Sequence, residues 1–193
     1  FFLIFNISYP QDQLYTYDRI KDTLYTWQNT FGNSQHPSGD YSGFGVIYSL
    51  DSIGYSSQDN LPIYVVKLSA NVNSREPEPK VLILGQCHAE EIYGVEIAME
   101  IINQFLHPEK YSDNRPYFQR GLYYTELWIV PTYNPEGLRV VHGYYEDDNT
   151  IQDVTYRKNK RDTNNNNIFD FINGIGGDID GVDLNRNYDF NWI

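Results

Sequence analysis

An apolar run, Val81–Leu84, leads directly into Gly85–Glu91, and the apolar residues after it recur at helical spacing. This spacing predicts a helix from Glu90 to Leu106, which His107-Pro108 ends. A second run rich in β-branched and aromatic residues, Tyr124–Val130, predicts another strand. Strand, helix and strand in this order imply a right-handed crossover and a largely parallel interior. The unit restricts the chain to an α/β fold.

The remaining elements fit around this unit. Apolar spacings of three and four predict an amphipathic helix from Leu14 to Thr30, and Val46–Leu50 and Ile63–Leu68 have the composition of strands. Asn134–Gly137 is predicted to be a tight loop at the end of a strand, where open α/β sheets place their ligands. Gly143–Gly181 is dense in Asn, Asp and Gly and predicts a long surface loop.

The length and the lack of linkers indicate one domain. A chain of 193 residues can bury a real core. We expect the domain to cover residues 15–193, with residues 1–14 as an N-terminal segment. Its start, Phe1–Phe5, is either the remnant of a signal peptide or an edge strand. The single cysteine, Cys87, rules out an internal disulfide framework and is predicted to be a small buried residue at a strand end.

Charge and hydropathy exclude two classes of partner. The chain has 14 basic and 26 acidic residues, a formal net charge of −12, which would repel a phosphate backbone. No stretch approaches the roughly 20 apolar residues that a membrane-spanning helix needs. We therefore expect neither nucleic acid nor a membrane span.

His88 and Glu91 lie three residues apart at the predicted turn from strand to helix, so an imidazole and a carboxylate can face the same metal. Alone this spacing is weak, because a Glu in a first helical turn is also favoured by the helix dipole. The later segment Asp183–Asn187 supplies a fixed cation, which a metal site needs to hold an anionic substrate. The conjunction predicts a catalytic zinc site.

Five segments together resemble the zinc metallocarboxypeptidases related to pancreatic carboxypeptidase A, in the same order along the chain. The resemblance runs from Tyr15 to the last residue and covers about the first half of such a catalytic domain. It implies a three-layer α/β fold with a mixed, mostly parallel sheet flanked by helices, incomplete at its C-terminal end. The segments are Ile53–Ser56 with Ile63–Lys67, Gly85–Glu91, Asn134–Gly137, Tyr156–Lys158 and Asp183–Asn187.

The resemblance assigns His88 and Glu91 as zinc ligands, and Asp183 as the carboxylate that accepts the other ring N–H of the metal-bound histidine. Asp183 can equally be a plain acidic loop residue. The third ligand, a His, and the general base, a Glu, lie in the family beyond the stretch that matches this chain. We expect no ligation from the other histidines, which are His36, His107 and His142.

Two arginines carry the substrate contacts that the resemblance implies. Asn185 and Arg186 match the pair that grips the free carboxylate of a substrate's last residue, a task that suits a guanidinium fork. Arg157 matches the arginine that polarises the scissile carbonyl and stabilises the oxyanion. The alternative for Arg157 is a basic cluster with Lys158, Lys160 and Arg161 that balances nearby acids.

Glu90 departs from many relatives, which carry Arg between the two ligands. We expect its extra negative charge near the entrance to disfavour peptides with acidic penultimate residues. Equal cleavage of acidic and basic penultimate residues would contradict this.

An Asn- and Asp-rich stretch predicts a second metal. Asp162, Asn164, Asn166 and Asp170 place oxygen-bearing side chains as in loops that wrap calcium. Asn167 and Asn173 stand where Gly and Glu are preferred, although Asp178 and Asp180 offer further charge. The alternative is a solvated Asn-rich loop.

The leading interpretation is an extracellular, secreted zinc metallocarboxypeptidase that acts on peptides or proteins with a free C-terminal carboxylate. Residues 1–193 alone are expected to be inactive and to bind zinc weakly. One alternative is a relative that cleaves another amide, such as a cell-wall peptide or an N-acyl amino acid. Another is a non-catalytic, carboxypeptidase-like module that binds calcium and a partner.

Overall fold

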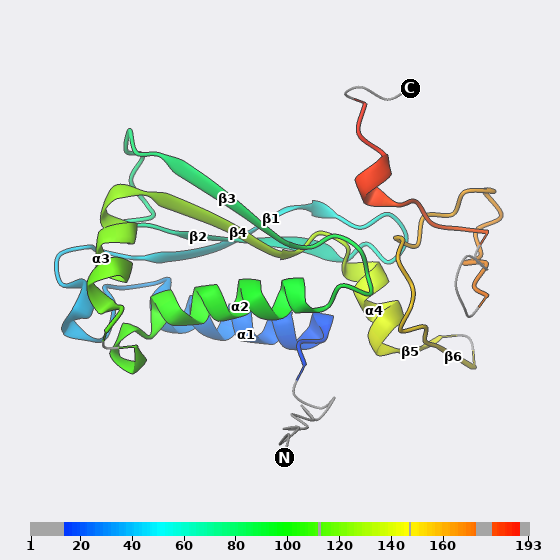
Figure 1. Ribbon diagram of the computed structural model, residues 1–193, viewed down its shortest axis with the longest axis horizontal. Helices are drawn as coiled ribbons and strands as arrows, with labels where there is room; N and C mark the ends of the chain where they lie inside the picture. Colours follow the sequence, from blue (N-terminus) through cyan, green and yellow to red (C-terminus); the bar gives the residue numbers. More distant parts are fainter. Residues whose placement is uncertain (1–13, 112, 147, 173–178, 190–193) are drawn as a thin grey trace, which may run out of the picture.

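The computed structural model describes residues 14–111, 113–146, 148–172 and 179–189 (Figure 1). Its main sheet has four strands in the order β1-β2-β4-β3, all in or next to segments where the sequence predicts strands. They are β1 (Tyr48–Tyr55), β2 (Pro62–Leu68), β3 (Lys80–Gln86) and β4 (Glu126–Thr132). β2 is antiparallel to both β1 and β4, whereas β3 and β4 are parallel.

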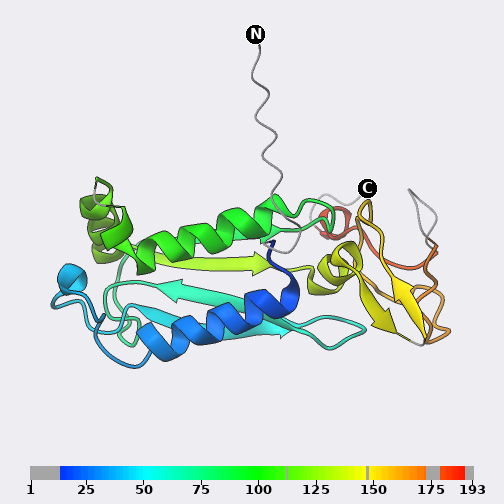
Figure 2. The ribbon, with the colours of Figure 1, turned by 90° about the horizontal axis from the view of Figure 1, so that it is seen from below.

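Two long helices, α1 (Tyr17–Phe31) and α2 (Tyr93–Leu106), lie side by side against one face of the sheet (Figures 1 and 2). Thr16 caps α1 by accepting a hydrogen bond from Arg19 N, and the apolar face predicted for this helix is buried. The residues buried between helices and sheet include Ile20, Leu24, Trp27, Val66, Met99, Ile102 and Ile129. This layer is the main hydrophobic core.

The β3–α2–β4 crossover is the predicted parallel unit, and the predicted α/β class with a mixed sheet flanked by helices is confirmed. The expected mostly parallel arrangement is not found among the described strands, because β2 runs antiparallel to both of its neighbours and the parallel pairing is limited to β3 and β4. The close approach at its carboxyl edge depends on Gly85, where a Cβ would lie against the Pro131 carbonyl oxygen and 2.9 Å from that of Gly94. The end of β3, the end of β4 and the start of α2 are therefore drawn together there.

Three predictions for the connecting segments are wrong in detail. The segment predicted as a tight loop opens a helix, α4 (Pro135–His142), because Asn134 accepts a hydrogen bond from Gly137 N at 3.1 Å and Pro135 suits a first helical turn. α3 (Arg115–Tyr124) precedes β4, so that strand begins at Glu126 rather than Tyr124.

The third difference is a small hairpin inside the predicted surface loop, formed by β5 (Tyr144–Glu146) and β6 (Asn149–Ile151). Single turns of 3-10 helix complete the fold: η2 (Gly39–Tyr41), η3 (Pro108–Lys110) and η4 (Leu184–Arg186). The part of the chain that the structure describes has no helix long and apolar enough to cross a membrane. Phe1–Phe5, predicted to be a signal-peptide remnant or an edge strand, and the rest of residues 1–13 lie outside the described residues.

A buried carboxylate on β4 gives the fold an acid-sensitive contact. Glu126 is 1% exposed, and its oxygens lie 3.0 Å from Lys67 Nζ and 3.1 Å from Lys80 Nζ. Burial opposes its ionisation, but hydrogen bonds from Lys67, Trp128 and Lys80 outweigh burial and lower the pKa of Glu126 to about 2.

Because this pKa is lower in the folded protein than in the unfolded chain, ionised Glu126 adds stability above pH about 4.5. That stability is lost as the pH falls toward 2 and amounts to about 3 kcal/mol. We expect Glu126→Gln to lower the free energy of unfolding at neutral pH and to flatten its dependence on pH across this window, measured by urea denaturation. Asp18→Asn is the control, because Asp18 is exposed and forms a surface ion pair with Lys21. A wild-type slope in the Glu126 variant would contradict the assignment.

Candidate active site

The turn between β3 and α2 carries His88, as the sequence predicts. Gln86, the last residue of β3, donates from Nε2 to the Ala89 carbonyl at 2.9 Å, and Glu91 N donates to the His88 carbonyl at 3.1 Å. Ala89 N in turn donates to the Arg157 carbonyl at 3.1 Å. These main-chain contacts fix the turn before α2 begins and join it to the segment around Arg157.

Asn134 links the same two segments from the side of β4. Its Nδ2 donates to the Cys87 carbonyl at 2.9 Å and to the Lys158 carbonyl at 3.0 Å. Glu136, 1% exposed, accepts hydrogen bonds from Gln58 N at 2.6 Å and Asp59 N at 2.8 Å. Neither side chain was assigned a role from the sequence, because Asn134-Pro135 is compatible with a tight turn as well as with a helix start.

The His88 ring lies between two carboxylates. Its Nδ1 is 3.1 Å from Glu91 Oε1, and its Nε2 is 3.2 Å from Asp183 Oδ1. The side chain is 8% exposed, while Glu91 is 59% exposed. The structure therefore brings together the two predicted zinc ligands and the predicted partner of the imidazole, from segments 95 residues apart.

Arg157 lies against the same ring. Its Nε is 2.9 Å from Asp183 Oδ2, its Nη1 is 3.0 Å from Glu90 Oε1, and its Nη2 is 2.8 Å from His88 Nε2. The hydrogen bond to Asp183 raises the pKa of Arg157, and Glu90 adds to this. Burial opposes the ionisation of Asp183, but Arg157 and the Asn185 main-chain N–H outweigh it and lower the pKa of Asp183. Both side chains are thus charged at neutral pH.

At Nε2, the His88 ring can form a hydrogen bond with Asp183 or with Arg157, but not with both. When Nε2 carries the hydrogen it donates to Asp183, and Nδ1 then presents a bare lone pair. Nδ1 is buried and makes no hydrogen bond within the part of the chain that the structure describes, although Glu91 Oε1 is only 3.1 Å away. A neutral imidazole nitrogen and a carboxylate oxygen that converge without bonding to each other fit zinc.

These two ligands do not complete a metal site by themselves. Within the described ranges no group of three or more His, Cys, Asp or Glu side chains is arranged to hold a metal. His36 is buried and lies 2.9 Å from the Leu106 carbonyl oxygen, and His107 contacts Glu109 at 3.2 Å.

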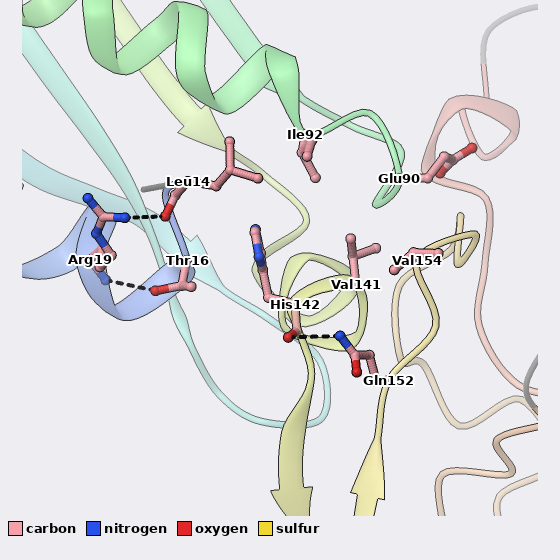
Figure 3. Close-up of a pocket in the computed structure, with 9 residues that line it drawn as sticks. All are labelled: Leu14, Thr16, Arg19, Glu90, Ile92, Val141, His142, Gln152 and Val154. Atoms are coloured by element: carbon pink, nitrogen blue, oxygen red, sulfur yellow. Dashed lines mark hydrogen bonds between the residues drawn. The ribbon is translucent and has the colours of Figure 1, made fainter. Parts of the chain in front are cut away.

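His142, at the end of α4, faces a separate cavity of about 450 Å³ (Figure 3). Its Nε2 is buried without a hydrogen-bond partner among the described residues, and burial, with a smaller effect from Arg19, lowers its pKa. Glu90 also lines this cavity, but its carboxylate turns away from the cavity toward the segment that carries Asp183 (Figure 3). The cavity therefore borders the site without being part of it.

The predicted carboxylate-binding pair follows Asp183 directly. Asp183 caps η4 by accepting a hydrogen bond from Asn185 N at 2.9 Å. Asn185 and Arg186 are both exposed, and Arg186 Nη1 donates to the Asn185 carbonyl at 3.0 Å. Asp183 therefore both contacts His88 and caps the 3-10 turn that carries Arg186.

The four residues predicted to bind calcium lie close together. Asp162 accepts hydrogen bonds from the main-chain N–H groups of Asn165 and Asn167, and Asp170 Oδ2 accepts from the side-chain amides of Asn164 at 2.6 Å and Asn166 at 2.9 Å. Asp180 is fully buried and binds Thr163 and the main chain of Asp170 instead. Asn173 and Asp178 lie outside the described residues, and calcium stays a prediction.

Glu90 does not present a free charge at the entrance, because it pairs with Arg157. The expected penalty for acidic penultimate residues stays a prediction.

Cys87 is half-buried after β3, and burial raises the pKa of its thiol.

Solved structures of carboxypeptidases share this fold. Carboxypeptidase A from Helicoverpa armigera aligns with a TM-score of 0.66 and 20% identity, over 94% of this chain and 35% of that one. Thrombin activatable fibrinolysis inhibitor aligns with a TM-score of 0.63 and 17% identity, over 94% of this chain and 36% of that one. The fold is that of the α/β carboxypeptidases.

Sequence comparison identifies the family. A profile described as zinc carboxypeptidase matches residues 43–193. A zinc carboxypeptidase of Saccharothrix mutabilis subsp. capreolus is 32% identical over 145 residues, 74% of this chain and 28% of the relative. The carboxypeptidase N catalytic chain of Rattus norvegicus is 28% identical over 89% of this chain and 30% of the relative. The chain belongs to the zinc carboxypeptidase family and spans less than a third of these two curated relatives.

Proposed function

We propose that this chain carries part of the active site of a zinc-dependent carboxypeptidase that removes C-terminal amino acids from peptides or proteins. The observation that supports this most directly is the convergence of His88 Nδ1 and Glu91 Oε1, 3.1 Å apart, with Nδ1 lacking a hydrogen-bond partner among the described residues. His88 and Glu91 would hold zinc there, and the metal would supply Lewis-acid chemistry for activating a water and polarising the scissile carbonyl.

Other residues of the chain have separate roles in the proposed reaction. Asp183 orients the His88 ring through Nε2, so that Nδ1 faces the metal. Arg157 supplies a fixed positive charge beside the ring, where it can stabilise an oxyanion. Arg186 and Asn185 bind the terminal carboxylate of the substrate, which makes the reaction specific for the chain end.

The test is release of the C-terminal amino acid from N-blocked dipeptides by the full-length protein. We expect release to stop on chelation and to return with zinc, and the same dipeptides with an amidated C-terminus to be poor substrates. No zinc-dependent release would refute the proposal. Equal cleavage of the amidated peptides would favour an amidase or endopeptidase instead. Residues 1–193 alone should show no release, because a third zinc ligand does not meet the other two in the described residues.

A further inference from the structure

Arg157 is fixed by two independent sets of contacts. Its main-chain carbonyl accepts a hydrogen bond from Ala89 N at 3.1 Å, while its guanidinium binds Asp183 at 2.9 Å and Glu90 at 3.0 Å. The Ala89 contact holds the backbone of Arg157 whatever happens at the tip of its side chain. Glu90 therefore acts on the guanidinium alone.

Glu90 and Glu91 are adjacent in sequence and compete for the same cation. Arg157 Nη1 is 3.0 Å from Glu90 Oε1 and 4.0 Å from Glu91 Oε1. Glu91 Oε1 is also the oxygen that faces His88 Nδ1. A shift of the guanidinium toward Glu91 would bring its positive charge close to Glu91 Oε1, the oxygen that would bind zinc.

The surroundings of Glu90 do not resemble those of an ordinary surface acid. Its side chain is 29% exposed, and its second oxygen is buried without a hydrogen-bond partner among the described residues. The turn does not need this carboxylate, because main-chain bonds and Gln86 already hold it. The contact with Arg157 is what the carboxylate contributes.

We propose that Glu90 is a positioning residue that holds Arg157 beside His88 and away from Glu91, so that Glu91 stays available to the metal. This rests on the proposed function, since it concerns the same site. Without Glu90 the guanidinium keeps its bond to Asp183 and pivots about it toward Glu91, the next carboxylate within reach.

The first test measures zinc affinity rather than activity. Apo full-length protein is titrated with zinc in competition with a chromophoric chelator, for Glu90→Gln alone and in an Arg157→Lys background. We expect E90Q to weaken zinc affinity roughly 10-fold, the low end of the effect seen for residues that support metal ligands. In the R157K background, E90Q should weaken zinc affinity by less than about twofold, because the single ammonium of a lysine cannot span two carboxylates.

The background separates positioning from plain charge. R157K keeps the positive charge, so a purely electrostatic effect of Glu90 would give the same loss in both backgrounds, and that result would overturn the proposal. Unchanged zinc affinity of E90Q would overturn it too. Glu109→Gln is the matched control, because Glu109 lies on η3, which follows the C-terminal end of α2, and contacts His107.

A second readout concerns catalysis at saturating zinc. E90Q should lower kcat roughly 10-fold and leave KM within about twofold, because a displaced Arg157 weakens stabilisation of the transition state and leaves the carboxylate clamp intact. Glu90→Asp should restore part of kcat. If E90Q weakens zinc affinity only when Arg157 is present but wild-type protein releases no amino acid, the positioning role stands and the proposed function fails.

Discussion

Replacing His88 with Ala is expected to weaken the zinc affinity of the full-length protein roughly 1,000-fold. Zinc held by protein side chains is bound by roughly 10–16 kcal/mol, so one ligand of three or four contributes about 3–5 kcal/mol. The loss follows from the geometry, since His88 Nδ1 is buried, has no hydrogen-bond partner in the described ranges and faces Glu91 Oε1. Titration of the apo protein against a chelator measures it.

The control for this change is His107→Ala. His107 lies at the far end of α2 and contacts Glu109, so its loss should leave zinc affinity unchanged. Zinc affinity that survives in H88A would show that the metal, if bound, is held elsewhere. An unfolded variant would be recognised by thermal denaturation, and His88→Gln, which keeps most of the side-chain volume, then replaces it.

The β3–α2–β4 unit could be predicted because local patterns determine it. The apolar run Val81–Leu84 and the helical spacing after Glu91 each lie within a short stretch of sequence. The face of α2 that this spacing predicts is the buried one. α4 could not be recognised in the same way, because Asn134-Pro135 suits both a tight turn and a capped helix start. The choice depends on tertiary contacts of Asn134 with the Cys87 and Lys158 carbonyls.

The candidate site, like the fold, could be predicted only in part from the sequence. The His88 and Glu91 pair is encoded by their spacing, and the family resemblance suggested Asp183. The pairing of Glu90 with Arg157 was missed, because the two are 67 residues apart and both belong to charged clusters in which many pairings are equally compatible with the sequence. The main-chain bond between Ala89 and Arg157, together with the contacts of Asn134 with the Cys87 and Lys158 carbonyls, brings these residues into register.

Arg186 and Arg157 differ in how much of their charge is available to a substrate. Arg157 is bound by Asp183 and Glu90, whereas the Arg186 guanidinium donates to the neutral carbonyl of Asn185. Exposed and lacking a carboxylate partner among the described residues, Arg186 is the better candidate for an incoming terminal carboxylate.

We therefore expect Arg186→Met to lower kcat/KM for peptides with a free C-terminus roughly 100-fold to 1,000-fold, the cost of losing one side of a charged hydrogen-bonded pair. Activity on C-terminally amidated peptides should hardly change, so the preference for free chain ends collapses. Arg161→Met is the matched control, since Arg161 is also an exposed arginine and takes no part in the ion pairs that join His88, Glu91, Arg157 and Asp183. If R186M keeps its preference for free C-termini, another cation must hold the carboxylate, and Arg157 would have to leave Glu90 to do so.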